Sequence, residues 1–276
     1  TILVLALALP AFAGNTEEAD RLWSEGYFEE SLNVVDAALD GATGDLRAEL
    51  LWRRSRAIHD LAGQLKRSQD KQVTLEMYEE GRQAATESLE IRSSAWAYYW
   101  RATNIGSWGD TKGILSSLDR LPDMKADLAE ALAIDPDHGD SWSVLAIIDA
   151  SVPGALGGSM DDAVSLDRRA VACWNGRGDI PLEWFKELSK HLYNRDFDAN
   201  KRYRKLPGKE KKFNRTDEFV EQHKSYEGVV DFDAPAIYTD RPLSELSDRE
   251  ESRLLLEWLI EQLEAKGEIL GLETRL

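Results

Sequence analysis

Residues 124–136 read MKADLAEALAIDP, and this stretch decides the fold class because it has the features of one helix in a repeated helical pair. Ala131 is small enough to let a neighbouring helix approach closely, and Pro136 cannot continue the helix. Trp142 follows six residues after Pro136 and begins another apolar helical pattern. This spacing predicts the first helix of the next pair in a repeat of about 34 residues.

Further stretches align with this unit, so the sequence predicts an all-α, tetratricopeptide-type helical repeat solenoid. Small residues such as Gly81, Ala85 and Ser88 mark the expected helix contacts, and stacking buries a face that no pair could bury alone. The fold class is therefore about four to five helix pairs plus a C-terminal capping helix. The expected helical stretches are 15–39, 46–61, 74–91, 95–105, 124–134, 141–150 and 160–174, with a weaker one at 181–193.

The beginning of the chain has the pattern of a secretory signal. Ile2–Leu9 is an uninterrupted apolar run that is too short to span a bilayer, and Ala11-Phe12-Ala13 fits a signal-peptidase site. The alternative is a buried N-terminal helix. The signal interpretation makes residues 1–13 a partial signal peptide and predicts a periplasmic protein that begins near Gly14. No cysteine follows the apolar run, so a lipid-anchoring site is not expected.

The remaining chain divides into three predicted segments: a repeat domain at 14–195, an irregular basic and extended segment packed on the repeats at 196–245, and a C-terminal helix at 246–276. Lys201–Arg215 holds eight basic residues against the single acidic Glu210, and its Pro207-Gly208 pair predicts a loop. The basic segment is either an exposed helix end and loop or a docking point for an acidic partner or anionic membrane.

Composition and residue spacing exclude several classes of site. The net charge of -17 disfavours nucleic acid, because phosphate binding needs a basic field. Cys173 is the only cysteine, so a disulfide within the chain and a zinc-thiolate site are excluded. The histidines at 59, 138, 191 and 223 form no ligand pair at helical spacing, and no nucleophile or phosphate-binding motif is present. We therefore expect no metal, no cofactor, no catalytic residue and no enzymatic activity.

The aromatic stretch at 95–118 suggests a place for binding. Trp100, Asn104 and Trp108 share one helical side by their four-residue spacing, and the helix is expected to break near Gly106–Gly109. The aromatic residues are either ordinary core or the lining of a cavity with Asn104 as its polar contact. A second irregular element at 151–159, rich in glycine, could line the same hollow. The candidate cavity residues are Trp96, Tyr99, Trp100, Asn104, Trp108, Leu118, Trp142, Pro153 and Leu156.

These motifs resemble the TatT family of tetratricopeptide proteins, which are associated with tripartite (TRAP) transporters of bacterial envelopes. The resemblance is carried by Tyr98–Ala102, Asn104, Gly106–Gly109, Leu118, Lys125, Ala131-Leu132, Asp135-Pro136, Pro153-Gly154 and Gly157-Gly158. It implies a cavity that holds a hydrophobic small molecule, a periplasmic solute-binding partner protein and self-association as trimers. The family is typically lipid-anchored, and this sequence lacks the required cysteine.

Three other interpretations stay open at this point. The first is a ligand-free interaction scaffold in cell-envelope assembly, with the hollow filled by side chains. The second is an envelope hydrolase, for which the sequence offers no motif. The third is a more distant likeness to eukaryotic microtubule-dynamics regulators with the same repeats. The signal-like start favours the TatT family over these regulators.

Overall fold

The computed structural model describes residues 9–113, 118–174, 176 and 178–265. Within these residues the secondary structure is helical, apart from one isolated antiparallel bridge between Pro235 and Pro242. The predicted all-α class is therefore confirmed. The chain divides into two compact units, Thr1–Pro136 and Asp137–Leu276, and this division falls inside the predicted repeat domain at 14–195. Each unit is described by itself.

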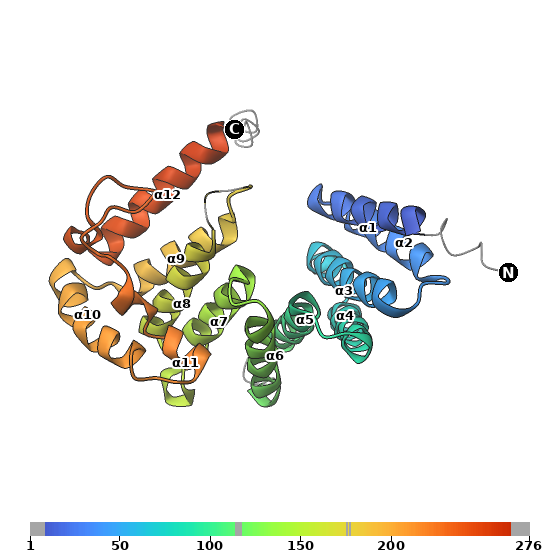
Figure 1. Ribbon diagram of the computed structural model, residues 1–276, viewed down its shortest axis with the longest axis horizontal. Helices are drawn as coiled ribbons and strands as arrows, with labels where there is room; N and C mark the ends of the chain where they lie inside the picture. The colour runs from blue at the N-terminus through green and yellow to red at the C-terminus, as the bar shows by residue number, and fades with distance from the viewer. Residues whose placement is uncertain (1–8, 114–117, 175, 177, 266–276) are drawn as a thin grey trace. The chain divides into compact units, whose positions relative to one another are not determined.

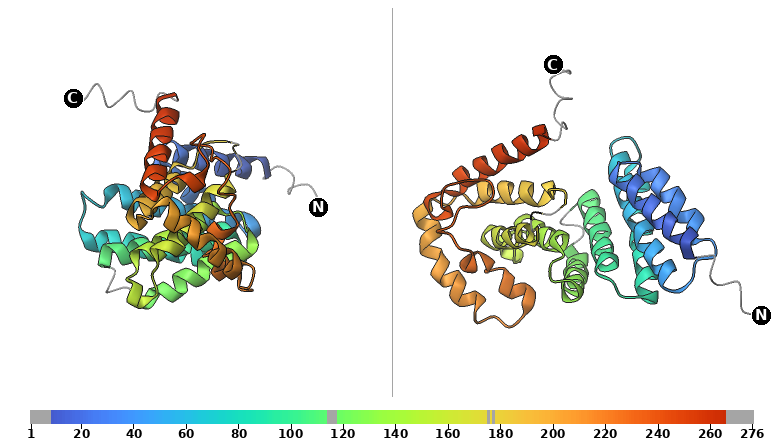
Figure 2. Two further views of the ribbon diagram at one scale, coloured as in Figure 1. Left: turned by 90° about the vertical axis from the view of Figure 1, so that its left-hand side faces the viewer. Right: turned by 45° about the horizontal axis from the view of Figure 1, so that its top comes forward.

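Unit 1 is built from antiparallel helix pairs that follow one another along the chain (Figure 1). The first helices of successive pairs also contact each other, α1 with α3 and α3 with α5, so these three form one layer of the unit (Figure 2). The elements are α1 (Leu9–Ser24), α2 (Phe28–Leu39), α3 (Gly44–Leu65), α4 (Lys71–Ile91), α5 (Ala95–Lys112), the short 3-10 helix η2 (Leu118–Arg120) and α6 (Leu121–Ile134).

Small residues allow these pairs to pack closely, as the sequence predicts. At Gly81 of α4 an added Cβ would lie 2.4 Å from Oδ1 of Asn104, so only glycine lets α5 come this close. Ser88 is fully buried and donates a hydrogen bond to the carbonyl of Ala48 at 2.8 Å. Ala85 is fully buried as well. The three predicted contact positions of α4 therefore face neighbouring helices.

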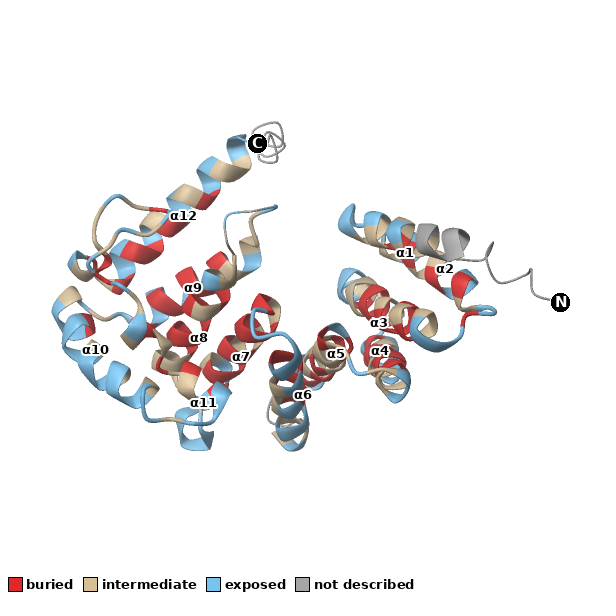
Figure 3. Cartoon of the chain, viewed as in Figure 1, coloured by how far each residue is buried: buried red, intermediate tan, exposed pale blue. Residues whose placement is uncertain are grey.

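Unit 2 begins with the pair α7 and α8, and α9 then packs on α8 and α12 on α9. Its apolar core is formed by Phe185, Leu188, Leu192, Leu246 and Leu255. Figure 3 shows buried positions concentrated on α7, α8 and α9, whereas α10 is largely exposed. The elements are α7 (Gly139–Ser151), η3 (Gly154–Leu156), α8 (Met160–Cys173), α9 (Leu182–Arg195), α10 (Ala199–Phe213), α11 (Phe219–His223), η4 (Tyr226–Val229), η5 (Leu243–Glu245) and α12 (Asp248–Ala265).

The predicted break near Gly106–Gly109 is wrong, because α5 continues through both glycines to Lys112. Gly106 lies against α6, where an added Cβ would come within 2.6 Å of the Met124 methyl carbon. The glycine therefore serves close helix packing and does not end the helix. The helix ends at Gly113, whose φ of 119° suits glycine. Residues 114–117 lie outside the described residues.

The loop predicted at Pro207-Gly208 is also wrong, because α10 is helical from Ala199 to Phe213 with Pro207 inside it. Asp198 caps its start by accepting a hydrogen bond from the Lys201 amide at 2.7 Å. Arg202, one turn in from the cap, is buried and donates to Glu251. A cap and a buried anchor together offset the hydrogen bond that Pro207 cannot donate.

The N-terminal helix α1 runs from Leu9 past Gly14, so it continues through the point where the signal interpretation places cleavage. Residues 1–8, which hold most of the predicted signal run, lie outside the described residues. Among the helices that the structure describes, none is both long enough and apolar enough to cross a membrane.

Candidate functional site

Five aromatic side chains gather on the layer formed by α1, α3 and α5, and we call them the tryptophan cluster. Trp52 stacks on Trp96, with 5.8 Å between ring centroids and 17° between planes. Trp23 meets Trp100 edge-on at 6.4 Å, and Tyr99 contacts both Trp96 and Trp100, at 6.0 and 5.0 Å. Trp52 and Trp100 are buried, whereas Trp96 keeps 41% of its surface exposed. The cluster therefore has a packed base and an accessible rim.

Two arginines of α3 cover the cluster and are held by one carboxylate. The guanidinium of Arg53 lies 4.1 Å from the Trp52 ring centroid, and that of Arg56 lies 4.3 Å from the Trp23 ring centroid. Asp20 of α1 accepts hydrogen bonds from Arg53 at 2.9 Å and from Arg56 at 2.6 Å. Burial raises the pKa of Asp20, but the two guanidiniums outweigh burial and hold that pKa below its ordinary value. The charged pairs thus join α1 to α3 beside the tryptophan cluster.

Behind the tryptophan cluster, His59 bridges a carboxylate and a hydroxyl in the order of a hydrolase triad. Its Nδ1 lies 2.7 Å from Oδ1 of Asp60, and its Nε2 lies 2.8 Å from Oγ of Ser107. Ser107 sits within α5, five residues before its end, so the nearby backbone N–H groups are committed to helical hydrogen bonds. They are not free to stabilise an oxyanion, as acyl transfer requires. The row is therefore suited to tying α3 to α5.

Asn104, a candidate polar contact for a cavity, is fully buried between α3, α4 and α5. Its Nδ2 donates to the Trp100 carbonyl at 2.8 Å and to Oγ of Ser55 at 3.0 Å. Its Oδ1 has no hydrogen-bond partner among the described residues and faces Gly81. Asn104 therefore lies in close helix packing beneath the cluster.

The other candidate residues of unit 1 lie near the C-terminal end of α5. Trp108 is half-buried, and the guanidinium of Arg120 covers its ring at 3.8 Å from the centroid. Leu118 is half-buried and opens η2, two residues before Arg120. The Trp108 ring therefore faces the cations Arg120 and Lys112, and it makes no ring contact with the tryptophan cluster among the described residues.

The remaining three candidates belong to unit 2 and are dispersed there. Trp142 is fully buried and packs against His223 and Phe219, with ring centroids 4.7 and 5.5 Å away. Pro153 and Leu156 are exposed on the turn after α7. The structure therefore places Trp142 in the core and the other two at the surface.

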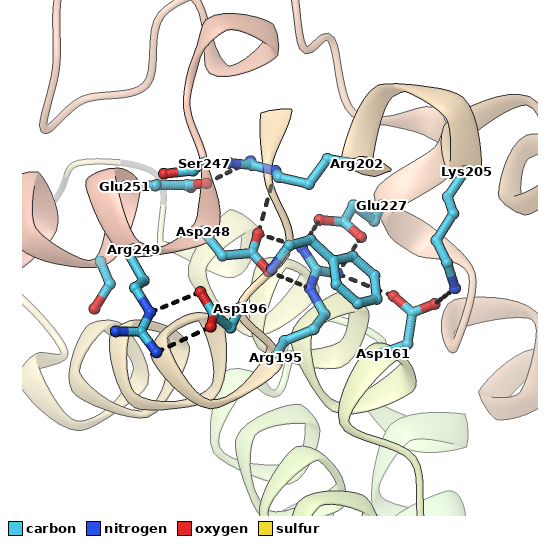
Figure 4. A network of polar contacts seen from close by, with 12 residues as sticks. Asp161, Arg195, Asp196, Arg202, Lys205, Glu227, Ser247, Asp248, Arg249 and Glu251 are labelled. Atoms are coloured by element: carbon cyan, nitrogen blue, oxygen red, sulfur yellow. Dashed lines mark hydrogen bonds and ion pairs between the residues drawn. The ribbon is translucent and has the colours of Figure 1, made fainter. Parts of the chain in front are cut away.

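Sequence reasoning missed a buried ionic network in unit 2, shown in Figure 4. Arg195 lies between Glu227 and Asp248, with nitrogen–oxygen distances of 2.7 Å to each. Arg168 binds Glu227 at 3.0 Å and Glu251 at 2.8 Å. Each of these side chains is at most 4% exposed. No pattern in the sequence joins residues as far apart as 168 and 251.

The cations keep the acids of this network ionised. Burial raises the pKa of Glu251, but Arg168 and Arg202 outweigh burial and lower that pKa to about 2. Burial also raises the pKa of Glu227, and its neighbouring cations again hold that pKa well below its ordinary value. The network is therefore a set of true charge pairs at neutral pH, whose role is to hold α8, α9, α10 and α12 together.

Asp167, next to this network, should make the stability of unit 2 depend on pH. Its carboxylate lies 2.6 Å from Nδ1 of His191, and burial raises its pKa from 3.8 to about 6. The folded chain then binds a proton in a range where the unfolded chain does not. The stabilising contribution is present below pH 3.8 and is lost as the pH rises through about 6.

Asp167→Asn keeps a hydrogen-bond acceptor for His191 but cannot titrate. Between pH 7.5 and pH 5.0, wild type should gain about 1 kcal/mol of unfolding free energy relative to this variant. Urea unfolding of the intact chain, followed by hydrogen exchange of unit 2 amides, measures the difference. Identical pH slopes in the two proteins would contradict the prediction.

Comparisons with known proteins show that this chain is similar to a family other than TatT, which the sequence motifs suggested. The family model described as "Regulator of microtubule dynamics protein 1-3" matches residues 15–147. Two relatives named "Regulator of microtubule dynamics protein 1", from Bos taurus and Pongo abelii, are 28% and 29% identical over 131 and 132 residues. Each alignment covers 48% of this chain and 40% of the relative's length. The matched region includes the whole tryptophan cluster.

The TatT assignment is therefore wrong, and the predictions that depended on it are wrong too. The match to proteins named for microtubule dynamics conflicts with the predicted periplasmic location and with the signal peptide that supported it. Four further predictions are wrong for the same reason: the solute-binding partner, the hydrophobic small ligand, the trimer and the cell-envelope scaffold. The motifs misled because residues such as Ala131 and Pro136 serve helix packing, which every family with these repeats shares.

Proposed function

We propose that this chain takes part in regulating microtubule dynamics as a non-catalytic helical repeat protein that binds a partner protein through unit 1. The match over residues 15–147 supports the link to microtubule dynamics, since the two relatives carry that name. The non-catalytic part is supported by the His59–Ser107 row, which lacks free oxyanion donors nearby. The observation that carries the binding part is the exposed rim of the tryptophan cluster.

Trp96 is well suited to anchor a partner. It is 41% exposed, yet its ring is fixed by stacking on Trp52 and by the edge contact with Tyr99. A side chain that is already ordered loses little conformational entropy when a partner covers it. Tryptophan and arginine dominate the binding energy of protein interfaces, and Arg53 lies beside the stack. Proteins built from stacked helical repeats commonly bind partners on the extended surfaces that the stacking creates.

The test uses microtubule assembly in a cytoplasmic extract, so that any intermediary protein is present. Adding the intact chain should change the rate of microtubule growth, followed by fluorescence microscopy. Trp96→Ala should raise the concentration needed for half of this effect at least tenfold, because hot-spot truncations cost about 2 kcal/mol or more.

Tyr27→Ala is the matched control, because Tyr27 is 52% exposed in the same unit but precedes α2, outside the α1–α3–α5 layer. It should act as wild type does. A wild-type chain without effect on growth, or equal potency of Trp96→Ala and Tyr27→Ala, would overturn the proposal. Circular dichroism melting checks that both variants stay folded.

A further inference from the structure

The outer face of α10 carries a line of positive charge, which we call the basic stripe. Its residues recur at intervals of three and four, which places them on one side of the helix. They are exposed, and Gly208 occupies the one position in the middle of the line that lacks a charge. The basic stripe consists of Lys201, Arg204, Lys205, Lys211 and Lys212, with Arg215 just beyond the helix end.

The opposite face of α10 is anchored, so the basic stripe is held on a fixed support. Arg202 is buried and bound to Glu251, and Lys209 binds Glu227 at 2.9 Å. In the stripe, Lys205 pairs with Asp161 at 2.8 Å. Its other five members form no ion pair within the described part of the chain. The chain as a whole is acidic, with 51 acidic residues, but the basic stripe is a local region where cations without a paired acid predominate.

A cavity of about 280 Å³ opens beside Gly208, in the middle of the basic stripe. Its lining includes Lys205, Lys209, Lys212 and Lys224, against the two carboxylates of Asp161 and Asp162. Asp161 is already matched by Lys205 and Lys209, both at 2.8 Å, and by Arg195 at 3.0 Å. Lys209 and Lys224 are also paired, with Glu227 at 2.9 Å and Glu221 at 2.6 Å, whereas Lys212 forms no ion pair within the described part of the chain. Lys212 is therefore the cavity lysine that can pair with an incoming anion.

Gly208 contributes to the lining of the cavity and adds no side chain to it. A Cβ built at this position meets no atom within 4 Å, so the helix can carry a larger residue here.

We propose that the basic stripe and this cavity bind an acidic segment of a partner polypeptide, with one carboxylate side chain seated in the cavity. From Lys201 to Arg215 the stripe is roughly 20 Å long, which corresponds to about six extended residues. Charges spread along a line fit successive carboxylates of a peptide. The net charge of -17 does not prevent this, because exposed charges beyond about 8 Å are largely screened at physiological salt.

A membrane is the less suitable partner for this surface. A helix that lies in a lipid interface needs an apolar face to bury among the acyl chains. The apolar residues Leu206 and Phe213 are only partly exposed on α10, and Leu206 packs on the core of unit 2. Tyr203 is the one exposed large aromatic residue among the described side chains of this helix.

Fluorescence anisotropy of a labelled ten-residue polyglutamate peptide tests the proposal on the intact chain. Wild type should bind the peptide with an affinity that falls as salt rises. Lys211→Glu/Lys212→Glu should weaken binding at least tenfold, because it reverses two unmatched cations. Lys66→Glu/Lys71→Glu makes the same charge change on exposed residues of unit 1 and should alter binding less than twofold.

Three results would overturn parts of the proposal. Equal losses in the two double variants would mean that net charge alone governs binding. Tighter binding to phosphatidylserine vesicles than to the peptide would exclude a polypeptide as the preferred partner. Gly208→Leu adds a bulky uncharged side chain to the lining of the cavity and suits a helix, so unchanged peptide affinity in this variant would exclude the cavity. Because the basic stripe lies outside residues 15–147, the microtubule assay on Trp96 variants succeeds or fails independently.

Discussion

Replacing Glu227 by alanine is expected to destabilise unit 2 by about 3–5 kcal/mol, because it leaves buried cations without their counter-charge. Glu227 binds Arg195 at 2.7 Å, Lys209 at 2.9 Å and Arg168 at 3.0 Å. All three cations come from helices that Glu227 joins, since Arg168 lies on α8, Arg195 on α9 and Lys209 on α10. Removing one carboxylate therefore weakens three helix contacts together.

The matched control is Arg249→Ala, which removes an ion pair of good geometry at the surface. Arg249 and Asp196 are each 54% exposed and lie 2.6 Å apart, beside the buried network (Figure 4). Solvent screens such a pair, so its loss should destabilise unit 2 far less than the loss of Glu227 does. Urea unfolding, combined with hydrogen exchange of unit 2 amides, measures both variants. A Glu227→Ala cost no larger than that of Arg249→Ala would refute the prediction.

Glu227→Gln separates charge from shape. The amide keeps the size of the side chain and one acceptor oxygen, but it cannot neutralise the cations. We expect a cost close to that of the alanine variant if charge dominates, since each buried guanidinium still lacks a full counter-charge. A glutamine variant as stable as wild type would instead assign the effect to hydrogen bonding alone.

Much of the fold could be predicted because the spacing of small residues and prolines along the sequence indicates where helices pack and end. The small residues of α4 and the proline at 136 mark contacts and helix ends that the structure contains, with α6 ending at Ile134 and α7 beginning at Gly139. Local spacing failed where a distant residue decides the outcome. Gly106 reads as a helix breaker until Met124 is seen packed against it. Pro207 likewise reads as a loop until the buried anchors of α10 are known.

The candidate site was predicted only in part, for the same reason. The sequence singled out Trp96 and Trp100 on α5, but their partners Trp52 and Trp23 lie on other helices and are joined to them only by the fold. The buried network was missed entirely, since acids and bases on helix surfaces usually indicate solvated faces. The family was misjudged because the signal-like start favoured TatT over the microtubule-dynamics regulators, and residues that serve repeat packing do not distinguish one repeat family from another.

Replacing Gly158 by alanine is the second change expected to destabilise unit 2 strongly, because the surrounding backbone leaves no room for a Cβ. A Cβ at Gly158 would lie 1.7 Å from the carbonyl oxygen of Val152 and 3.0 Å from that of Asp149. Both are backbone atoms: Val152 opens the turn between α7 and α8, and Asp149 lies near the end of α7, where its carbonyl accepts a hydrogen bond from the Ser159 amide at 2.8 Å. The clash can be relieved only by moving that turn. Overpacking of this kind should cost unit 2 about 3 kcal/mol.

Gly154→Ala tests whether this cost comes from the close approach or from losing any glycine in the turn. Gly154 lies four residues earlier, and a Cβ there would meet no atom within 4 Å. Its φ is not among the positive ones, so alanine can adopt the same backbone conformation. We expect a change within about 0.5 kcal/mol for Gly154→Ala. Equal stability of the two alanine variants in urea unfolding would mean that the turn moves freely, and α7 and α8 would then not depend on Gly158 for their pairing.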